Sequence, residues 1–536
     1  MVRRNRFWLV ALVAAIVFLS SCAVGDEQGR GSRGASDAAE VVVAMPKSSE
    51  NAAGFDPIRG WGCGGHSHEP LIQSTLVTTT PDMSFEADLA TEWSMADDGM
   101  SWNFTIDDGV EFSDGTPLTA ADVAFTINAV LENPDALCEL TGVERAIAQD
   151  DTSLTIEMDE PNNALLYTLA VLGVVPEGGY GESYGAAPIG SGRYLLKHWE
   201  QGQQAILTAN PSYGGDRPVM ERVVVVFMDE DPTLAALRAG DIDVGYVHPT
   251  KAKQDIAGYA QTSYPTVDSR GISLPVGPAG DTADVGGRSY AAGNDVTTHR
   301  AIRQALNYAV DRNTMVDNVL DGHARPAFSV ADGMPWGSEA VRVENDADRA
   351  RQILADDGWT ADADGVLARA GVRAEIDLLY PANDSARQAL AVEFSRHAEA
   401  IGIAVNPVGL SWDEIYERQY STPVLWGWGS NSPTELYNLT HSEGWGNFPR
   451  HESEKVDQHL DEAVHTSDLD ESFEQFRLAQ ETPEGHGPEG AAAWVWLVNV
   501  DHVYYVRDGL NIAEQELHPH GHGWSLVNDI DQWSWQ

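Results

Sequence analysis

Four side chains that commonly bind transition metals lie within seven positions near the start of the chain. The stretch reads GWGCGGHSHEP and contains Cys63, His66, His68 and Glu69. Thiolate, imidazole and carboxylate groups are ligands for nickel, copper and zinc. The glycines also let backbone approach a ligand closely, and the ring of Trp61 could stack on one. The pattern is therefore compatible with a catalytic metal site, the mouth of a binding pocket, or a glycine-rich polar turn.

A second group of imidazoles lies near the end of the chain. The stretch HPHGHGW places His518, His520 and His522 at alternating positions. A β-strand would present all three to one face, whereas Gly521 and Gly523 are equally compatible with a loop. In both groups the histidines could bind a metal, or they could be hydrogen-bonded residues of a cleft or loop.

A metal-dependent hydrolase is the remote alternative that the first cluster suggests. A catalytic metal needs three protein ligands, an open position and usually a nearby base. Here Glu69 is followed by Pro70, and the sequence contains no HExxH motif, nucleophile elbow or Walker motif. We therefore expect that the protein is not an enzyme.

The charge of the chain limits its partners. Its 536 residues include 33 Lys and Arg against 82 Asp and Glu, a formal net charge of −49. Such a surface repels phosphate backbones, so no nucleic-acid partner is expected. The acids are spread along the whole chain, which favours a solvated acidic surface suited to a salty medium over a docking face for a cationic partner.

The first residues predict export and lipid anchoring. Residues 1–21 have a basic start and an apolar run, 7–19, with the layout of a signal peptide. The run ends in LSSC, which resembles a bacterial lipobox, so Cys22 is expected to be lipidated at the outer face of the cell membrane. A plain signal peptide with a chance cysteine is the alternative. Residues 22–39 are small and polar, as in a flexible tether.

Two more cysteines would then lie in an oxidising compartment. Cys63 and Cys138 are the cysteines that remain after Cys22. Cysteines of exported proteins often pair, so a disulfide between them is expected. A metal-bound thiolate and two unpaired thiols stay open as alternatives.

The elements that would hold these residues alternate between strand-like and helix-like segments, the pattern of an α/β protein. VVVAM and VVVVFM read as buried strands, and residues 294–320 have helical spacing with Asp295 or Thr297 as possible caps. The segments 267–276 and 494–506 read as two strand-like crossovers between lobes. Two such connections are typical of a hinged clamp.

Four segments carry a resemblance to a known family. Residues 88–134, 187–218, 237–247 and 301–327 include EFSDGTPLTAADVAF, PIGSGRYLLKHWE, LRAGDIDVGYV and AIRQALNYAVDRNTM. They resemble, in the same order, the bacterial solute-binding proteins of family 5, the peptide and nickel class. These proteins are the extracytoplasmic receptors of ABC importers.

The resemblance implies a fold and a set of partners. The fold is a two-lobed α/β clamp of the periplasmic-binding-protein type, type II, in its large peptide-binding class. Lobe I is expected at 40–268 plus 500–536, with an extra subdomain at about 65–185, and lobe II at 269–499. The partners are a small-molecule ligand and ABC permease and ATPase subunits, and the receptor is expected to be a monomer.

The resemblance also points to cleft residues. SAR in YPANDSARQAL matches the arginine that binds the ligand carboxylate in dipeptide-binding relatives, which makes Arg387 the candidate. The following strand end, GWGSN, supplies Trp428, Ser430 and Asn431. The glycine-rich stretch is expected to border the same pocket, with contacts from the residues Trp61, Cys63, His66 and His68.

Two departures from the relatives leave the ligand open. Dipeptide-binding relatives hold the ligand ammonium with an aspartate after the strand end, but residues 429–432 carry no charge here and the nearest acid is Glu435. Nickel-chelate relatives use an arginine before PIGSG, and residues 169–192 contain none. We expect a short peptide or a peptide-like metal chelate, with nickel or a nickel chelate as the alternative. No resident cofactor is expected.

Overall fold

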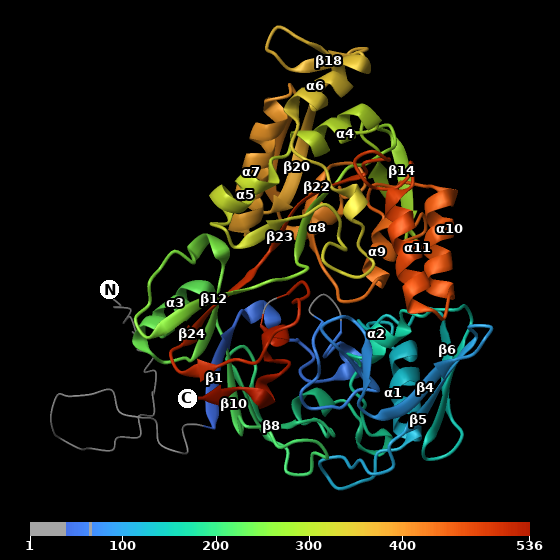
Figure 1. The fold of residues 1–536 in the computed structure, drawn as a ribbon, viewed down its shortest axis with the longest axis vertical. Helices are drawn as coiled ribbons and strands as arrows, with labels where there is room; N and C mark the ends of the chain where they lie inside the picture. The colour runs from blue at the N-terminus through green and yellow to red at the C-terminus, as the bar shows by residue number, and fades with distance from the viewer. Residues whose placement is uncertain (1–38, 64–66, 522) are drawn as a thin grey trace, which may run out of the picture.

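The computed structural model describes residues 39–63, 67–521 and 523–536. Figure 1 shows one body of helices and strands above a broader body that carries both ends of the described chain. We call the lower body the first lobe and the upper body the second lobe. The predicted signal segment, Cys22 and almost all of the tether lie outside the described residues, as do His66 and His522.

A seven-stranded mixed sheet forms the centre of the first lobe. Its central strand β1 pairs in parallel with β10 and β11, and the outer strands run antiparallel. The valines of VVVAM and VVVVF are largely buried on both faces, as expected of strands covered from two sides. In spatial order the strands are β12 Tyr259–Tyr264, β24 His502–Arg507, β11 Val244–Val247, β1 Glu40–Met45, β10 Arg222–Phe227, β9 Gln204–Ala209 and β8 Tyr194–Glu200.

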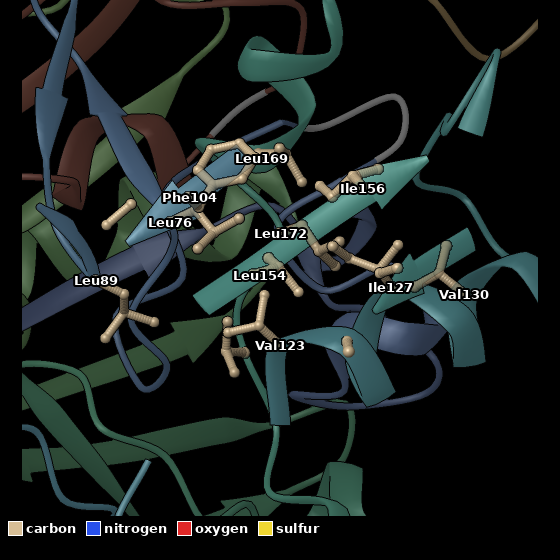
Figure 2. Close-up of a cluster of buried hydrophobic side chains, with 14 of the residues drawn as sticks. Leu76, Leu89, Phe104, Val123, Ile127, Val130, Leu154, Ile156, Leu169 and Leu172 are labelled. Carbon is tan, nitrogen blue, oxygen red and sulfur yellow. The ribbon is translucent and has the colours of Figure 1, made fainter. Parts of the chain in front are cut away.

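A four-stranded antiparallel sheet forms a subdomain of the first lobe. Helix α1, Ala120–Glu132, packs against it and begins with a capping box between Thr119 and Asp122. Leucine, isoleucine, valine and phenylalanine side chains from the helix and the strands fill the space between them (Figure 2). The strands, in spatial order, are β4 Ala90–Met95, β5 Ser101–Ile106, β7 Ser153–Met158 and β6 Val143–Ala148.

The second lobe is built on a six-stranded mixed sheet. Strand β20 pairs in parallel with β21 and β22, and β13 pairs antiparallel with β22 and β23. The strands, in spatial order, are β16 Ala324–Pro326, β23 Trp494–Val500, β13 Ser269–Ser273, β22 Val424–Trp428, β20 Glu375–Pro381 and β21 Ala404–Leu410. The helices of this lobe are α4 Arg300–Ala309, α5 Arg312–Val319, α6 Ala347–Asp356, α7 Ser385–Glu399, α8 Trp412–Tyr416, α9 Thr434–Thr440, α10 Glu454–His465 and α11 Leu469–Glu481.

The remaining elements are short or lie at the edges. In the first lobe they are α2 Leu165–Leu169, α3 Glu230–Ala239, β2 Val77–Thr79, β3 Phe85–Ala87, β25 Leu510–Asn511 and β26 Ser534–Trp535. In the second lobe they are β14 Asp281–Val285, β15 Arg288–Ala292, β17 Thr360–Ala361, β18 Leu367–Arg369 and β19 Val372–Arg373. Among the described residues no helix is both long enough and apolar enough to cross a membrane.

The chain passes between the two large sheets at two places. One passage leads from β12 to β13, residues 264–269, and the other from β23 to β24, residues 500–502. Both passages lie within or next to the crossovers predicted at 267–276 and 494–506. We use the term hinge for these two connections together.

One predicted helix is divided in the structure. The helical pattern of residues 294–320 forms α4 and α5, because α4 ends at Ala309, the backbone is extended at Val310, and the Asp311 side chain caps α5 through the Thr314 amide. The proposed caps have other roles: Thr297 donates to the Pro275 carbonyl, and Asp295 accepts from the Ala279 amide. The helical spacing therefore corresponds to two helices, and the prediction of Asp295 or Thr297 as the cap is wrong.

Candidate functional site

A cavity of about 520 Å³ lies between the two lobes. Its first-lobe wall comes from the glycine-rich stretch, the loop around Cys138, helix α2 and the C-terminal loop that includes residues 516–520. Its second-lobe wall comes from the end of β22, the start of α7, and helices α8 and α9. Clefts of this size between lobes are typical of small-molecule sites.

A disulfide joins two parts of the first-lobe wall. Cys63 and Cys138 are bonded, with their Cα atoms 5.1 Å apart, and both line the cavity. This is the pairing that the sequence analysis expected. The next residue, Glu139, reaches across to the second lobe, where it accepts hydrogen bonds from Asn438 Nδ2 at 3.0 Å and Trp445 Nε1 at 3.1 Å. The disulfide therefore fixes the loop that touches the opposite lobe.

Aromatic rings form a continuous stack along the second-lobe wall. Trp412 stacks on Trp426 with ring centres 5.8 Å apart, and Trp426 stacks on Phe448 at 4.3 Å. Phe448 continues to Trp428 at 6.0 Å, and Trp428 meets Trp445 edge-on at 5.7 Å. Four of these rings, all but Phe448, line the cavity. Such a wall favours flat or apolar groups and cations.

Arg387 lies where the sequence analysis placed it, at the start of α7 and on the cavity wall. Asp384 caps the helix by accepting from the Arg387 amide at 2.8 Å, and its other oxygen pairs with Arg387 Nη1 at 2.5 Å. The guanidinium also lies over the ring of Trp412, 5.8 Å from its centre. Burial, together with the positive charge of Arg270, lowers the pKa of Arg387.

The guanidinium retains an unused donor. Arg387 Nε is buried and has no hydrogen-bond partner among the described residues. In the same wall, Trp428 Nε1 and Asn431 Oδ1 are also buried without partners in the described chain. Asn431 Nδ2 donates to the Leu517 carbonyl at 3.2 Å. Unsatisfied buried polar groups are costly, so a ligand that reaches these atoms would gain affinity.

Carboxyl groups outnumber cations along the cavity. Glu69, Glu139, Glu435 and Glu516 all line it, against Arg387. Burial raises the pKa of Glu435 to about 8 and that of Glu69 and Glu516 to about 7. Burial also raises the pKa of Glu139. A cationic ligand group close to these carboxyl groups would favour their ionised forms.

Glu139, Glu435 and Glu516 were not predicted as site residues, whereas Glu69 belongs to the cluster singled out at the start of the chain. Glu435 lies in α9 and lines the cavity together with Gly429 and Ser430, the strand end where a charge was missing. The only sequence feature that pointed to Glu435 as a site residue was its position six residues after Gly429. Glu139 follows Cys138 directly, and the expected disulfide could have pointed to it. Glu516 had no comparable signal.

Trp61 occupies a different place from the one predicted. It is 2% exposed and packs against Phe55, His68 and Trp524, with ring centres 4.6, 4.4 and 4.7 Å away. Its ring belongs to the core of the first lobe and does not line the cavity. The expected stacking of Trp61 on a ligand is therefore corrected: its neighbour His68 lies at the cavity instead.

The described histidines do not converge on one metal position. His68 contacts the Glu69 carbonyl through Nδ1 at 2.8 Å. His518 is buried against His502, Nδ1 to Nδ1 3.1 Å, whereas His520 Nδ1 lies 2.5 Å from Asp268 Oδ1 at the cavity. The segment holding His518 and His520 is a loop, so the two rings face different partners. In the described residues no group of three or more His, Cys, Asp or Glu could hold a metal ion.

The family follows from a sequence profile. The profile named "Bacterial extracellular solute-binding proteins, family 5 Middle" matches residues 84–448, which is more than half of the chain. The chain belongs to this family. It is therefore a substrate-binding protein of the ABC-transporter class that works outside the cytoplasm, and not an enzyme.

Individual relatives cover nearly the whole chain of this family 5 protein. Protein XP55 of Streptomyces lividans is 32% identical over 92% of this chain and 90% of its own. The oligopeptide-binding protein AppA of Bacillus subtilis is 25% identical over 89% and 91%. NikZ of Campylobacter jejuni, solved in complex with Ni(L-His), has the same fold, with a TM-score of 0.74 at 22% identity over 92% of this chain and 99% of its own.

Proposed function

We propose that this family 5 protein captures a short peptide or a peptide-like metal chelate in the interlobe cavity and delivers it to an ABC permease. The observation that carries the proposal is Arg387, a nearly buried guanidinium on the cavity wall with an unpartnered Nε. A guanidinium can bind a carboxylate with two parallel hydrogen bonds. A peptide and an amino-acid chelate both present such a carboxylate.

The acidic residues of the cavity would bind the ammonium group of the proposed peptide. Glu435, in helix α9, lies on the same second-lobe wall as Arg387. A free peptide carries one carboxylate and one ammonium, which match one arginine and one carboxyl group. The aromatic stack would then contact the side chains of the peptide.

A nickel chelate is the second candidate, and it has support of its own. His68 and His520 both line the cavity, and imidazole is a good nickel ligand. Because the described residues offer no cluster of three ligands, a metal would have to bring most of its ligands with it. The relative solved with Ni(L-His) carries its metal in that form.

Native mass spectrometry with elemental analysis separates the two candidates. The protein is purified from its own host without chelating resin, so that its bound ligand is retained. Bound masses that match short peptides, without stoichiometric metal, support the peptide. Nickel or another metal near one equivalent supports the chelate. A bound molecule that has neither a carboxylate nor a metal would contradict both.

Anchoring through Cys22 belongs to the same proposal. Lipidation would hold the receptor at the outer face of the membrane, near its permease. A Cys22→Ala form should therefore appear in the medium with its fold and ligand intact, as measured by cell fractionation. Continued tight membrane association of that form would contradict the anchor.

A further inference from the structure

We infer that Asp268 is a positioning residue that couples the hinge to the ligand cavity. Asp268 lies in the first hinge connection and is fully buried. It does not line the cavity, so its effect on a ligand would act through its neighbours. Asp268 would hold the two lobes relative to each other whichever ligand binds.

The carboxylate of Asp268 bridges the two lobes. Its Oδ2 accepts from Arg270 Nη2 at 3.1 Å, and Oδ1 accepts from Arg270 Nη1. On the first-lobe side, His520 Nδ1 lies 2.5 Å from Oδ1, and His502 Nε2 lies 3.6 Å from Oδ2. Arg270 belongs to β13 of the second lobe, whereas His502 begins β24 of the first. One buried carboxylate thus contacts side chains on both sides of the hinge.

Backbone hydrogen bonds bring three chain segments together at the same point. The Val500 amide of the second hinge connection donates to the Asp268 carbonyl at 2.8 Å. The Val267 amide donates to the His518 carbonyl at 2.9 Å, and the His520 amide donates to the Gly429 carbonyl at 2.7 Å. The C-terminal loop therefore contacts both the hinge and the strand end that lines the cavity.

Gly427 shows how closely Arg270 and His520, two side-chain partners of Asp268, approach Arg387 of the cavity wall. A methyl group at Gly427 would lie 2.2 Å from Arg387 Nη2, 2.9 Å from Arg270 Nη1 and 3.0 Å from His520 Cε1. Three side chains thus converge on a Cα that carries no side chain. Arg270 and Gly427 are also paired in the β13–β22 register. The position of Arg387 in the cavity therefore depends on where Arg270 is held.

The charges of this cluster balance only when Asp268 is ionised. Arg270 and Arg387 are the cations, and Asp268 and Asp384 are the carboxylates paired with them. Without the Asp268 charge, Arg270 would be a buried cation that faces Arg387 without its own counter-charge. Such an unpaired charge is costly and would drive local rearrangement. The bridge between the lobes would loosen at the hinge.

The test measures the distance between the lobes in ligand-free protein. Nitroxide labels are attached at Leu131→Cys in α1 and Val392→Cys in α7, both exposed and in different lobes, with the Cys63–Cys138 disulfide intact. Double electron–electron resonance then gives the distance distribution. In Asp268→Asn we expect the ratio of open to closed molecules to change by about two- to thirtyfold, the range for a residue that couples two parts of a protein.

Asp243→Asn is the matched control. Asp243 is also buried and pairs with an arginine, Arg507 Nε at 2.6 Å, but both residues lie in the first lobe. This variant should lose stability without a change in the distance distribution. His520→Gln removes one Asp268 partner at a more exposed position and tests the inference if Asp268→Asn does not fold. The inference is overturned if both Asp268→Asn and His520→Gln give the wild-type distance distribution. If Asp268→Asn does not fold, a wild-type distribution in His520→Gln alone overturns it. A shift in Asp243→Asn equal to that in Asp268→Asn would also overturn it.

Discussion

At the scale of single residues, the cavity is defined by one cation among several acids. Arg387 is the one lysine or arginine among the described residues that line it, and Asp384 already occupies one of its amino groups. The unpartnered Nε leaves a donor for a ligand carboxylate. A ligand that binds here would therefore share the arginine with Asp384 and not replace it.

Removal of this guanidinium should weaken binding strongly. In Arg387→Ala we expect the affinity for a carboxylate ligand to fall roughly ten- to a hundredfold, because a charged hydrogen-bonded contact is lost. Isothermal titration with the carboxylate ligand identified by mass spectrometry measures the change. Arg396→Ala is the control, since Arg396 lies on the same helix but pairs with Glu393 at the surface. Unchanged affinity in Arg387→Ala would remove this residue from the site.

Glu435 should make stability depend on pH. Its folded pKa of about 8 lies above the ordinary value of 4.5, so its contribution is fully present below pH 4.5 and is lost as the pH rises through 8. Glu435→Gln, which mimics the protonated form, should therefore be more stable than the wild type at high pH, by about 5 kcal/mol at most, and should differ little from it at low pH. Urea unfolding at several pH values measures the difference.

The exposed Glu399 at the end of α7 provides the comparison. Because Glu399 is exposed, Glu399→Gln should change the free energy of unfolding little. If Glu435→Gln followed the same course as Glu399→Gln, the pKa of Glu435 would not be raised in the folded protein. The ligand would then have no proton to displace at this position.

At the scale of elements, the start of helix α7 contains both a helix cap and Arg387, the proposed ligand-binding residue. Asp384 both caps the helix and pairs with Arg387. Asp384→Ala should lower the free energy of unfolding by about 1–2 kcal/mol, because the first turn loses its cap. Asp384→Asn keeps the cap and removes the charge, so it should lose less stability in the same urea titration. Equal losses in both variants would show that the ion pair, and not the cap, stabilises the helix.

Local sequence patterns predicted some of the helices and strands correctly and missed one helix boundary. Buried strands such as β1 and β10 follow from apolar runs, and α3 ends at Gly240, as its sequence indicates. The break between α4 and α5 was missed because Asp311 reads as one more polar residue in an amphipathic pattern. Local spacing does not reveal which side chain will cap a helix when the pattern continues past it.

The site was predictable in part, for a similar reason. Arg387, Trp428, Ser430 and Asn431 line the cavity as expected, because they follow a strand end or open a helix in a recognisable motif. Trp61 was misplaced because its partners Phe55 and Trp524 are 6 and 463 positions away, and only the fold brings all three together. Glu139, Glu435 and Glu516 were missed because their role depends on burial, which single residues in a sequence do not report.

At the scale of the whole molecule, the net charge of −49 determines how stability depends on salt. Like charges on one surface repel each other, and salt screens that repulsion over about 10 Å at 0.1 M and about 3 Å at 1 M. We therefore expect the melting temperature to rise by several degrees between those salt concentrations. Differential scanning calorimetry measures the shift. A melting temperature that falls with salt would mean that paired charges contribute more than the repulsion.

The two lobes also meet on the side of the cavity remote from the hinge. Asn163 of the first lobe donates from Nδ2 to the Ala463 and Thr466 carbonyls, both at 2.8 Å, at the end of α10. Glu139 makes the second such contact, with Asn438 and Trp445. Both contacts would break if the lobes separated. The structure therefore describes the clamp in its closed form.

The aromatic stack of the cavity wall gives the protein an intrinsic spectroscopic signal for ligand binding. Trp412 and Trp426 lie 5.8 Å apart at an angle of 20°, close enough for the excited states of neighbouring indoles to mix. Trp428 and Trp445, at the other end of the stack, meet where the two lobes come into contact. A ligand that slides between the lobes changes the surroundings of these rings. Its arrival can therefore be followed by circular dichroism and intrinsic fluorescence, without any attached dye.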